Sequence, residues 1–331
     1  MALVLAPVDG HGRIVAPDGT CLRASIDIGT VTCRMLVTLV DGRRKLYEVA
    51  RLYRITNLGE GVDASKTLRS EAIERVRCAI ASFKAELSRY ERDLGCRAEL
   101  RAVATSAARD ARNGSDLVRV LAEEGVRLRI VSGDREASLS FSGVSREFPG
   151  QSIAVIDIGG GSTEVVAGRA GEGIASARSF DIGCRRATEK LLGEDLVDPE
   201  AETRLRRWIR SEMEPHFRQL GETGLLNGRL VGVAGTATTI VSVRDRMERY
   251  DCSKVHGAVV TREQLADQRL TLAGMALEER QRVVGLDPKR AAVIVSGLVI
   301  MEEVMDLAGI GEFTVSESDI LQGVILAVDF D

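Results

Sequence analysis

The sequence predicts an α/β protein made of two related lobes. A chain of 331 residues is too long for one ordinary domain and suits two. Apolar, β-branched segments alternate with segments of helical period, which is typical of α/β architecture. A short signature also occurs twice, as Asp27-Ile-Gly29-Thr30 and as Asp157-Ile-Gly159-Gly160-Gly161-Ser162-Thr163, 130 residues later. We therefore expect one anion-handling loop in each lobe, with the two loops facing each other across an interlobe cleft.

The first half opens with a lead-in, residues 1–22, that glycine and proline punctuate and that we expect to be irregular. Apolar residues recur with helical period from Ile73 to Leu87, and β-branched runs flank the first signature. The expected elements are strands at 23–28 and 34–40, a helix at 70–90, a strand at 99–105, a helix at 115–124, a strand at 126–131 and a helix at 132–144.

The second half repeats this alternation after the second signature. The expected elements are strands at 152–158 and 163–167, a helix at 199–220, a strand at 229–233, a loop and helix over 235–244, and helices at 262–273 and 289–308. We place the first lobe at residues 1–132 and the second at residues 133–317. The last helix, within 318–331, is expected to pack back on the first lobe.

Composition excludes several classes of function. The formal net charge is −4, so the whole chain offers no attractive field to nucleic acid. The six cysteines are scattered and there are three histidines, which gives a zinc site little to build on. No apolar run approaches the ~20 residues that span a bilayer. We expect a cytoplasmic protein without a membrane partner.

The setting of the two signatures excludes two familiar phosphate-binding motifs. In P-loop and Rossmann proteins the glycines lead from a strand into a helix. Here both glycine loops lead from a strand into another strand, so the phosphate contacts would come from the backbone N–H groups of a hairpin. Three glycines without Cβ atoms, Gly159, Gly160 and Gly161, let those amides approach an anion closely, and Ser162 and Thr163 add hydroxyl donors. The alternative is an ordinary tight turn.

Carboxylates beside phosphate-binding amides point to a metal ion. Asp27 and Asp157 each end an apolar strand, where a carboxylate is costly without a partner. A Mg²⁺ ion between carboxylate and phosphate would remove the repulsion between them, and Glu164 could reach the same ion. The alternatives are turn-forming aspartates and an exposed strand glutamate.

Two further residues stand before the second signature. Glu136 begins a predicted helix, where a glutamate is also favoured simply by the helix dipole. Arg109 follows a predicted strand, where a guanidinium can grip phosphate in a bidentate way, although a solvated surface arginine is the ordinary alternative. Composition alone does not single out either residue.

Nine segments in order give the chain a more specific resemblance. They are SIDIGTVTCRMLV, LGEGV, AVATSAARDARN, VSGDREA, VIDIGGGSTEVV, DIGCRRATE, VGVAGTATTI, YDCSKVHG and VSESDILQG. From about residue 23 onward the chain resembles the Ppx/GppA phosphatase family, and more closely its short exopolyphosphatases. The resemblance implies two ribonuclease-H-like lobes of the actin-like ATPase fold with the active site between them. It also implies stepwise hydrolysis of terminal phosphate from inorganic polyphosphate.

The resemblance also implies a role for each candidate residue. Glu136 would act as the general base on water, with Asp157 and Glu164 holding metal and water and Arg109 gripping phosphate. Asp27, Gly29 and Thr30 would face the phosphate from the first lobe, with Asp27 near the metal, and Gly235 and Thr236 would form another phosphate loop. The implied cofactor is Mg²⁺ or Mn²⁺, with a monovalent cation as stimulator, and the implied assembly is a homodimer.

Two positions depart from the family pattern. The first loop usually reads Gly-Ser-Asn-Ser/Thr, whereas this chain has Val31 in place of the asparagine. Asn57 stands where an arginine often precedes Leu-Gly. Both departures bear on phosphate affinity and on substrate preference.

Three alternatives to an exopolyphosphatase stay open. The same site could hydrolyse guanosine pentaphosphate to the tetraphosphate. Sugar and acetate kinases share the paired Asp-Gly loops, although Glu136 directs the site toward water. A third alternative is a sensor that binds polyphosphate or an alarmone without catalysis.

Overall fold

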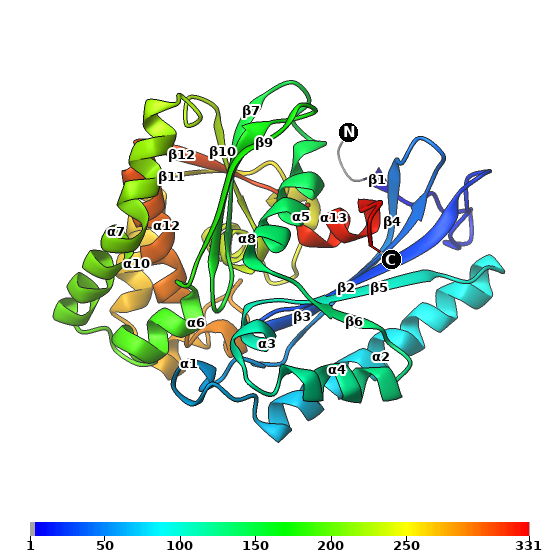
Figure 1. Ribbon diagram of the computed structural model, residues 1–331, viewed down its shortest axis with the longest axis horizontal. Helices are drawn as coiled ribbons and strands as arrows, with labels where there is room; N and C mark the ends of the chain where they lie inside the picture. Colours follow the sequence, from blue (N-terminus) through cyan, green and yellow to red (C-terminus); the bar gives the residue numbers. More distant parts are fainter. Residues whose placement is uncertain (1–3, 331) are drawn as a thin grey trace. The chain divides into compact units, whose positions relative to one another are not determined.

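The computed structural model describes residues 4–330, which form two compact units (Figure 1). Unit 1 comprises the chain up to Glu147 together with the segment from Ile320 onward, and unit 2 runs from Phe148 to Asp319. Residues 133–145, which the sequence boundary assigns to the second lobe, thus form a helix of unit 1. That helix packs closely on the helix formed by Ile320–Leu326, and this contact draws it into unit 1.

Unit 1 is built on a six-stranded sheet of order β1-β4-β3-β2-β5-β6. β2, β3 and β4 form an antiparallel meander, and β5 and β6 continue the sheet parallel to β2. A short strand in the lead-in that we expected to be irregular, β1, pairs with β4. The strands are β1 (Val4–Leu5), β2 (Cys21–Ile28), β3 (Thr32–Val40), β4 (Leu46–Ile55), β5 (Glu99–Ala104) and β6 (Leu128–Ile130).

Helices cover both faces of this sheet. Ala24, Ile26 and Ile28 alternate along β2 and share one apolar cluster with residues of α2 and α4, whereas Ser25 on the opposite face contacts α13. Val103 of β5 likewise packs with α5 and α13 on that opposite face. The helices of unit 1 are α1 (Val62–Ser65), α2 (Ser70–Leu94), α3 (Ser106–Asp110), α4 (Gly114–Glu123), α5 (Gly133–Ser145) and α13 (Ile320–Leu326).

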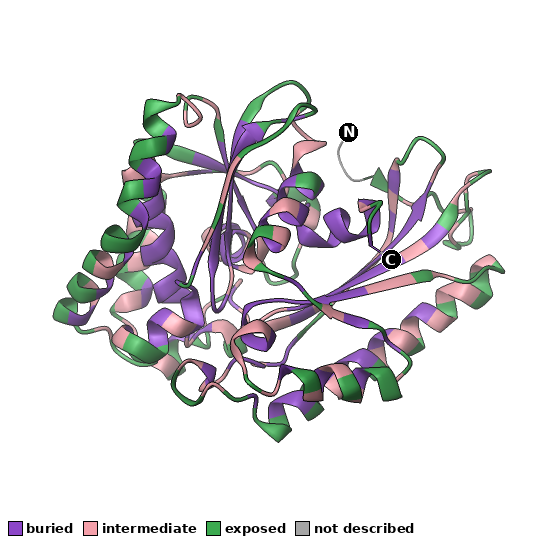
Figure 2. Cartoon of the chain, in the orientation of Figure 1, coloured by how far each residue is buried: buried purple, intermediate pink, exposed green. Residues whose placement is uncertain are grey.

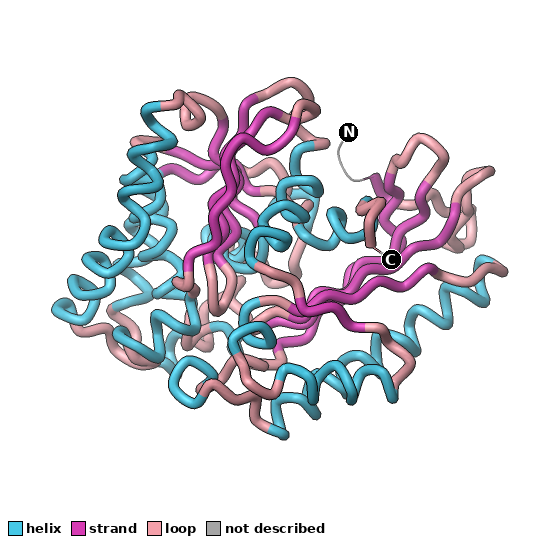
Figure 3. Tube along the Cα trace, in the orientation of Figure 1, coloured by secondary structure: helices cyan, strands magenta, loops and turns pink. Residues whose placement is uncertain are grey.

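Unit 2 repeats the same plan (Figure 3). Its sheet has the order β11-β12-β10-β7-β8-β9, in which β7, β8 and β9 form the antiparallel meander and β10 and β12 run parallel to β7. The strands are β7 (Ser152–Ile158), β8 (Thr163–Arg169), β9 (Gly173–Phe180), β10 (Arg229–Val233), β11 (Val259–Thr261) and β12 (Glu312–Val315). Two lobes of one topology are what the repeated signature predicted.

One helix forms the centre of the core of unit 2. α12 is buried along most of its length, as Figure 2 shows, and α7, α8 and α10 pack around it. Among the described residues, no helix is both long and apolar enough to cross a lipid bilayer. The helices are α6 (Cys184–Ala187), the π-helix η1 (Thr188–Leu192), α7 (Pro199–Glu222), α8 (Ala234–Arg244), α9 (Cys252–Val255), α10 (Arg262–Ala273), α11 (Leu277–Arg280), the 3₁₀-helix η2 (Pro288–Arg290) and α12 (Ile294–Ala308).

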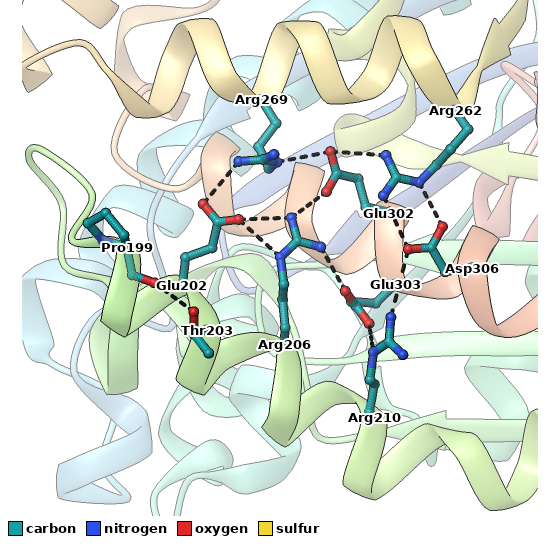
Figure 4. Close-up of polar contacts among 10 residues, drawn as sticks. All are labelled: Pro199, Glu202, Thr203, Arg206, Arg210, Arg262, Arg269, Glu302, Glu303 and Asp306. Atoms are coloured by element: carbon teal, nitrogen blue, oxygen red, sulfur yellow. Dashed lines mark hydrogen bonds and ion pairs between the residues drawn. The ribbon is translucent and has the colours of Figure 1, made fainter.

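A charged network ties α7 and α10 to this buried helix (Figure 4). Glu302 and Glu303 of α12 are almost fully buried. Arg206 of α7 contacts both carboxylates, and Arg269 of α10 donates to Glu302 across 2.9 Å. Burying a carboxylate is costly unless it is paired, so these arginines allow α12 to carry two charges into the core.

The predicted helix at 289–308 begins later than expected. η2 covers Pro288–Arg290, and α12 starts at Ile294. Between them the carbonyl of Ala291 accepts a hydrogen bond of 3.1 Å from the buried guanidinium of Arg280. That carbonyl is therefore diverted from the bond that a continuous helix would require.

Candidate active site

The second signature forms a hairpin whose two strands carry facing carboxylates. In the register of β7 and β8, Asp157 lies directly opposite Glu164, and both side chains are buried. The turn is closed by a hydrogen bond of 3.0 Å from Gly159 N to Ser162 O. Ser179 of the next strand donates to Glu164 Oε1 across 2.6 Å and so orients that carboxylate.

The glycines of this turn direct their amides to one side. The carbonyls of Gly159 and Gly160 accept hydrogen bonds from the amides of Cys184 and Arg185 at 2.9 and 2.8 Å. The Arg186 side chain donates to the Gly161 carbonyl at 2.8 Å. In a planar trans peptide the N–H points opposite to the C=O. The amides that follow these carbonyls therefore point away from the α6 segment, an arrangement that suits an anion.

The first signature forms the same turn with a different charge balance. Gly29 N donates to Thr32 O across 2.9 Å, as in the second hairpin. Directly opposite Asp27 in the register stands Arg34, whose Nη2 lies 2.6 Å from Asp27 Oδ2. Arg34 is not among the candidate residues that the sequence motifs indicate. A four-residue turn between antiparallel strands places residue 34 opposite residue 27, so the hairpin register is the signal that could have found it.

The segment after β4 supports the first loop as α6 supports the second. Gly59 N donates to Thr30 O at 2.8 Å, and the amides of Thr56 and Asn57 donate to Val31 O at 3.0 and 2.9 Å. Asn57 has φ 47°, a left-handed conformation that asparagine tolerates better than most side chains. Asparagine is thus compatible with the left-handed backbone of this turn.

The sheet of unit 1 brings Arg109 to Glu136. β5 and β6 are parallel neighbours, so the segments after them, leading into α3 and α5, leave the same edge of the sheet. Arg109 Nη1 lies 3.0 Å from Glu136 Oε2 and 3.2 Å from the Val131 carbonyl. Ser132 caps α5 by accepting from the Arg135 amide, which fixes the helical turn that carries Glu136. The contact pairs the carboxylate of Glu136 with the positive charge of Arg109.

Gly235 and Thr236 lie where β10 passes into α8. Thr236 Oγ1 donates to the Ile158 carbonyl across 2.9 Å, which ties this turn to the strand that carries Asp157. A Cβ atom at Gly235 would lie 1.9 Å from Arg290 Nη1, so the guanidinium of Arg290 packs directly on the glycine. Arg290 is not among the candidate residues that the sequence motifs indicate. It lies 55 residues beyond Gly235, and no local pattern relates the two.

A cysteine lies near each loop, and neither thiol is available as a nucleophile. Burial raises the pKa of the Cys33 thiol well above its usual range, and the nearby Asp27 carboxylate raises it further. Burial also raises the pKa of Cys184, which follows the glycine that supports the second loop. Both thiols therefore remain protonated at neutral pH.

The donor set of the second hairpin fits a hard divalent cation. Asp157 and Glu164 offer carboxylate oxygens from facing positions, and Mg²⁺ is commonly held by one or two carboxylates with water and substrate phosphates completing its shell. Within residues 4–330 no group of three or more histidine, cysteine, aspartate or glutamate side chains is placed to hold a metal. Asp27, which we expected near the metal, contacts Arg34, and its place near a metal stays a prediction.

The predicted site residues thus fall into three groups within their units. Asp27, Gly29 and Thr30 share the first hairpin, and Arg109 meets Glu136 nearby at the carboxyl edge of the same sheet. Thr105 N donates to Ile28 O, which links the two groups of unit 1. The third group lies in unit 2 and joins the second hairpin to the turn at Gly235 and Thr236.

Comparison with known proteins places this geometry in a family. The model of the Ppx/GppA phosphatase family matches residues 36–328. The chain belongs to the Ppx/GppA phosphatase family. Exopolyphosphatase 2 of Mycobacterium tuberculosis is 35% identical over 320 residues, which cover 92% of this chain and 98% of that protein. A bifunctional 3-dehydroquinate synthase/phosphatase of Fusobacterium nucleatum is 37% identical over 319 residues, but the chain spans only 46% of its length.

Solved structures of this family share the fold. The Aquifex aeolicus Ppx/GppA family member superimposes with a TM-score of 0.73 at 26% identity, over 92% of this chain and 96% of that one. An exopolyphosphatase-like protein gives a TM-score of 0.83 at 29% identity, over 93% and 98% of the two chains. The predicted α/β fold with two actin-like lobes is confirmed by these matches and by the repeated sheet topology.

Proposed function

We propose that this chain is an exopolyphosphatase that releases terminal orthophosphate from inorganic polyphosphate. Its membership of a phosphatase family and its likeness to a protein named exopolyphosphatase support a phosphoanhydride substrate. The observation that carries the proposal is the contact of 3.0 Å between Arg109 and Glu136. This contact joins Glu136, the proposed proton acceptor, to Arg109, the proposed phosphate-binding cation.

In the proposed reaction Glu136 accepts a proton from water while the water oxygen attacks the terminal phosphorus. The bond from that phosphorus to its bridging oxygen breaks, which releases orthophosphate and leaves a chain one phosphate shorter. Arg109 would bind a non-bridging oxygen of the terminal phosphate beside Glu136. Water is a poor nucleophile at neutral pH, so removal of this base should slow the reaction strongly.

The second hairpin would stabilise the negative charge that develops on the phosphoryl group during its transfer to water. The amides of Gly160, Gly161 and Ser162 would donate to phosphate oxygens, and Asp157 with Glu164 would hold Mg²⁺ or Mn²⁺. The bound metal would stabilise negative charge on the transferring phosphoryl group. Gly29 and Thr30 of the first hairpin and Gly235 and Thr236 would make further phosphate contacts. Stimulation by a monovalent cation, a homodimer and a cytoplasmic location stay predictions from the family resemblance.

The test is a phosphate-release assay with polyphosphates of defined length, run with Mg²⁺ and with excess chelator. We expect Glu136→Gln, which keeps the size of the side chain, to lower kcat about 100- to 10,000-fold. Glu71→Gln is the matched control, because Glu71 also lies in the first turn of a helix but is exposed. Full activity of the Glu136 variant would refute the proposed mechanism.

The same assay separates the alternative functions. Release of phosphate from guanosine pentaphosphate but not from polyphosphate would make guanosine pentaphosphate the substrate. Transfer of phosphate to ADP in place of water would make the protein a phosphotransferase. Binding of polyphosphate without release would make it a sensor.

A further inference from the structure

The last helix of unit 1 meets the helix of Glu136 at a point where both backbones touch. α13 packs on α5 through Gly323, and a Cβ atom at Gly323 would lie 2.0 Å from the Leu139 carbonyl oxygen and 2.6 Å from its carbon. Both of these are backbone atoms, so no side-chain rotation could relieve the contact. Leu139 lies one turn beyond Glu136 on α5. The absence of a side chain at Gly323 therefore allows α5 to lie this close to α13.

The far end of α13 is held by arginines, which we call the arginine clamp: Arg23, Arg44 and Arg101. The last four carbonyls of a helix lack partners within it. Here Arg101 donates to Val324 O at 3.1 Å and to Ala327 O at 2.5 Å. Arg23 donates to Ile325 O at 3.2 Å, and Arg44 donates to Leu326 O. Three guanidinium groups thus satisfy four consecutive carbonyls at the negative end of the helix dipole.

Two more contacts hold this segment in place. Ser25 of β2 donates to the Leu321 carbonyl across 2.9 Å, on the buried face of α13. Beyond the helix, the guanidinium groups of Arg101 and Arg129 lie over the ring of Phe330, at 5.3 and 5.2 Å from its centre. Asp329 pairs with Arg135, the residue before Glu136, across 2.6 Å. The segment is thus anchored to the sheet on one side and to the first turn of α5 on the other.

We propose that Gly323 and the arginine clamp are positioning residues that set the place of Glu136. This inference rests on the proposed role of Glu136 as the general base. Because the clamp fixes α13 to the sheet, a side chain at position 323 would displace α5 and would carry Glu136 with it. A displacement of about 1 Å at a reacting group can cost up to about 100-fold in rate.

The first test is Gly323→Ala, assayed for phosphate release from polyphosphate with Mg²⁺. We expect kcat per folded molecule to fall about 10- to 100-fold while KM changes less than about twofold, since Glu136 acts on water. Gly221→Ala is the matched control, because Gly221 lies in helix α7 with no atom within 4 Å of a Cβ built there. Unchanged kcat in Gly323→Ala, or a loss explained wholly by unfolded protein, would overturn the proposal.

A double variant separates positioning from simple stability. Arg101→Gln weakens the clamp and alone should lower stability and reduce kcat about threefold. Combined with Gly323→Ala, it lets α13 move instead of α5, so the double variant should be less stable than Gly323→Ala but several times more active. If the loss of kcat in the double variant equalled the product of the losses in the two single variants, this mechanism would be contradicted. If Gly323→Ala does not fold, Arg101→Gln alone decides, and an unchanged kcat would overturn the proposal.

Glu136→Gln distinguishes this inference from the function on which it rests. If Gly323 acts through Glu136, adding Gly323→Ala to Glu136→Gln should not lower the residual rate further. A further fall of tenfold would place the effect of Gly323 elsewhere. Full activity of Glu136→Gln alone would instead remove the proposed base, whatever Gly323 does.

Discussion

The two signature hairpins have the same backbone and opposite charge arrangements. Each joins the first two strands of a meander, closes a four-residue turn with one hydrogen bond, and rests on a glycine of the segment after the third strand. At the position opposite the aspartate, however, unit 1 has Arg34 and unit 2 has Glu164. A repeated fold has therefore kept its geometry while the electrostatics of its two copies have diverged.

The difference in charge indicates different tasks for the two hairpins. Asp27 is paired within its own hairpin, so that loop can meet an anion without a metal. Asp157 and Glu164 occupy facing positions, where two ionised carboxylates repel each other. A divalent cation at Asp157 and Glu164 would turn this repulsion into attraction. The charge difference is therefore a reason to propose the metal at the second hairpin and not at the first.

The largest expected effect comes from changing the charge that distinguishes the second hairpin. Glu164→Gln keeps the shape of the side chain but leaves one carboxylate facing an amide. We expect the rate of phosphate release to fall about 100-fold or more, because charge stabilisation at the phosphoryl group is lost. The melting temperature in chelator should not fall, since the repulsion between the strands is reduced. In the unaltered protein Mg²⁺ should raise the melting temperature, and in this variant that rise should shrink.

Ser179→Ala provides an intermediate case, because it removes the hydroxyl that orients Glu164 and leaves both carboxylates in place. Its response to Mg²⁺ should fall between that of the unaltered protein and that of Glu164→Gln. If Mg²⁺ raised the melting temperature of Glu164→Gln as much as that of the unaltered protein, the second hairpin would not hold the metal. The difference in charge between the two hairpins would then not indicate different tasks.

The glycines that support the two hairpins, Gly59 and Gly183, should differ in their sensitivity to substitution by alanine. A Cβ atom at Gly183 would lie 2.4 Å from the carbonyl carbon of Gly160, which is backbone of the phosphate loop. A Cβ atom at Gly59 would lie 2.2 Å from a methyl group of Thr30, which is side chain. We expect Gly183→Ala to cost about 2 kcal/mol of unfolding free energy and Gly59→Ala about 1 kcal/mol, because a side chain yields more easily than backbone.

Denaturant unfolding and kcat/KM for polyphosphate would be measured on both variants. Gly183→Ala should lower kcat/KM about tenfold by moving the amides of the second loop, and Gly59→Ala should lower it less. Equal losses, or a larger loss at Gly59, would show that the second loop is not the more rigid of the two.

Local signals explain what could be predicted from the sequence. The periodic helix at 199–220 and both hairpins depend on neighbouring residues, and all of them are present. β4 and β9 were missed because they carry arginines, serines and exposed residues that break the apolar pattern of a strand. Arg290 could not be foreseen, because its contact with Gly235 arises only when η2 and α8 pack together. The pairing of Asp27 with Arg34 required a register that composition does not give.

The smallest expected effect concerns the residue that departs from the family pattern. Val31 is buried in the first turn, at the position that Gly161 occupies in the second, and its carbonyl already accepts two amides. Val31→Asn would add one amide donor, and a hydrogen bond of about 1 kcal/mol corresponds to a KM for polyphosphate about three- to fivefold lower. Val31→Ala removes the same methyl groups without adding a donor and should not lower KM. If both variants raised KM alike, the first hairpin would bind phosphate through its backbone alone, and the two hairpins would be more similar than their charges indicate.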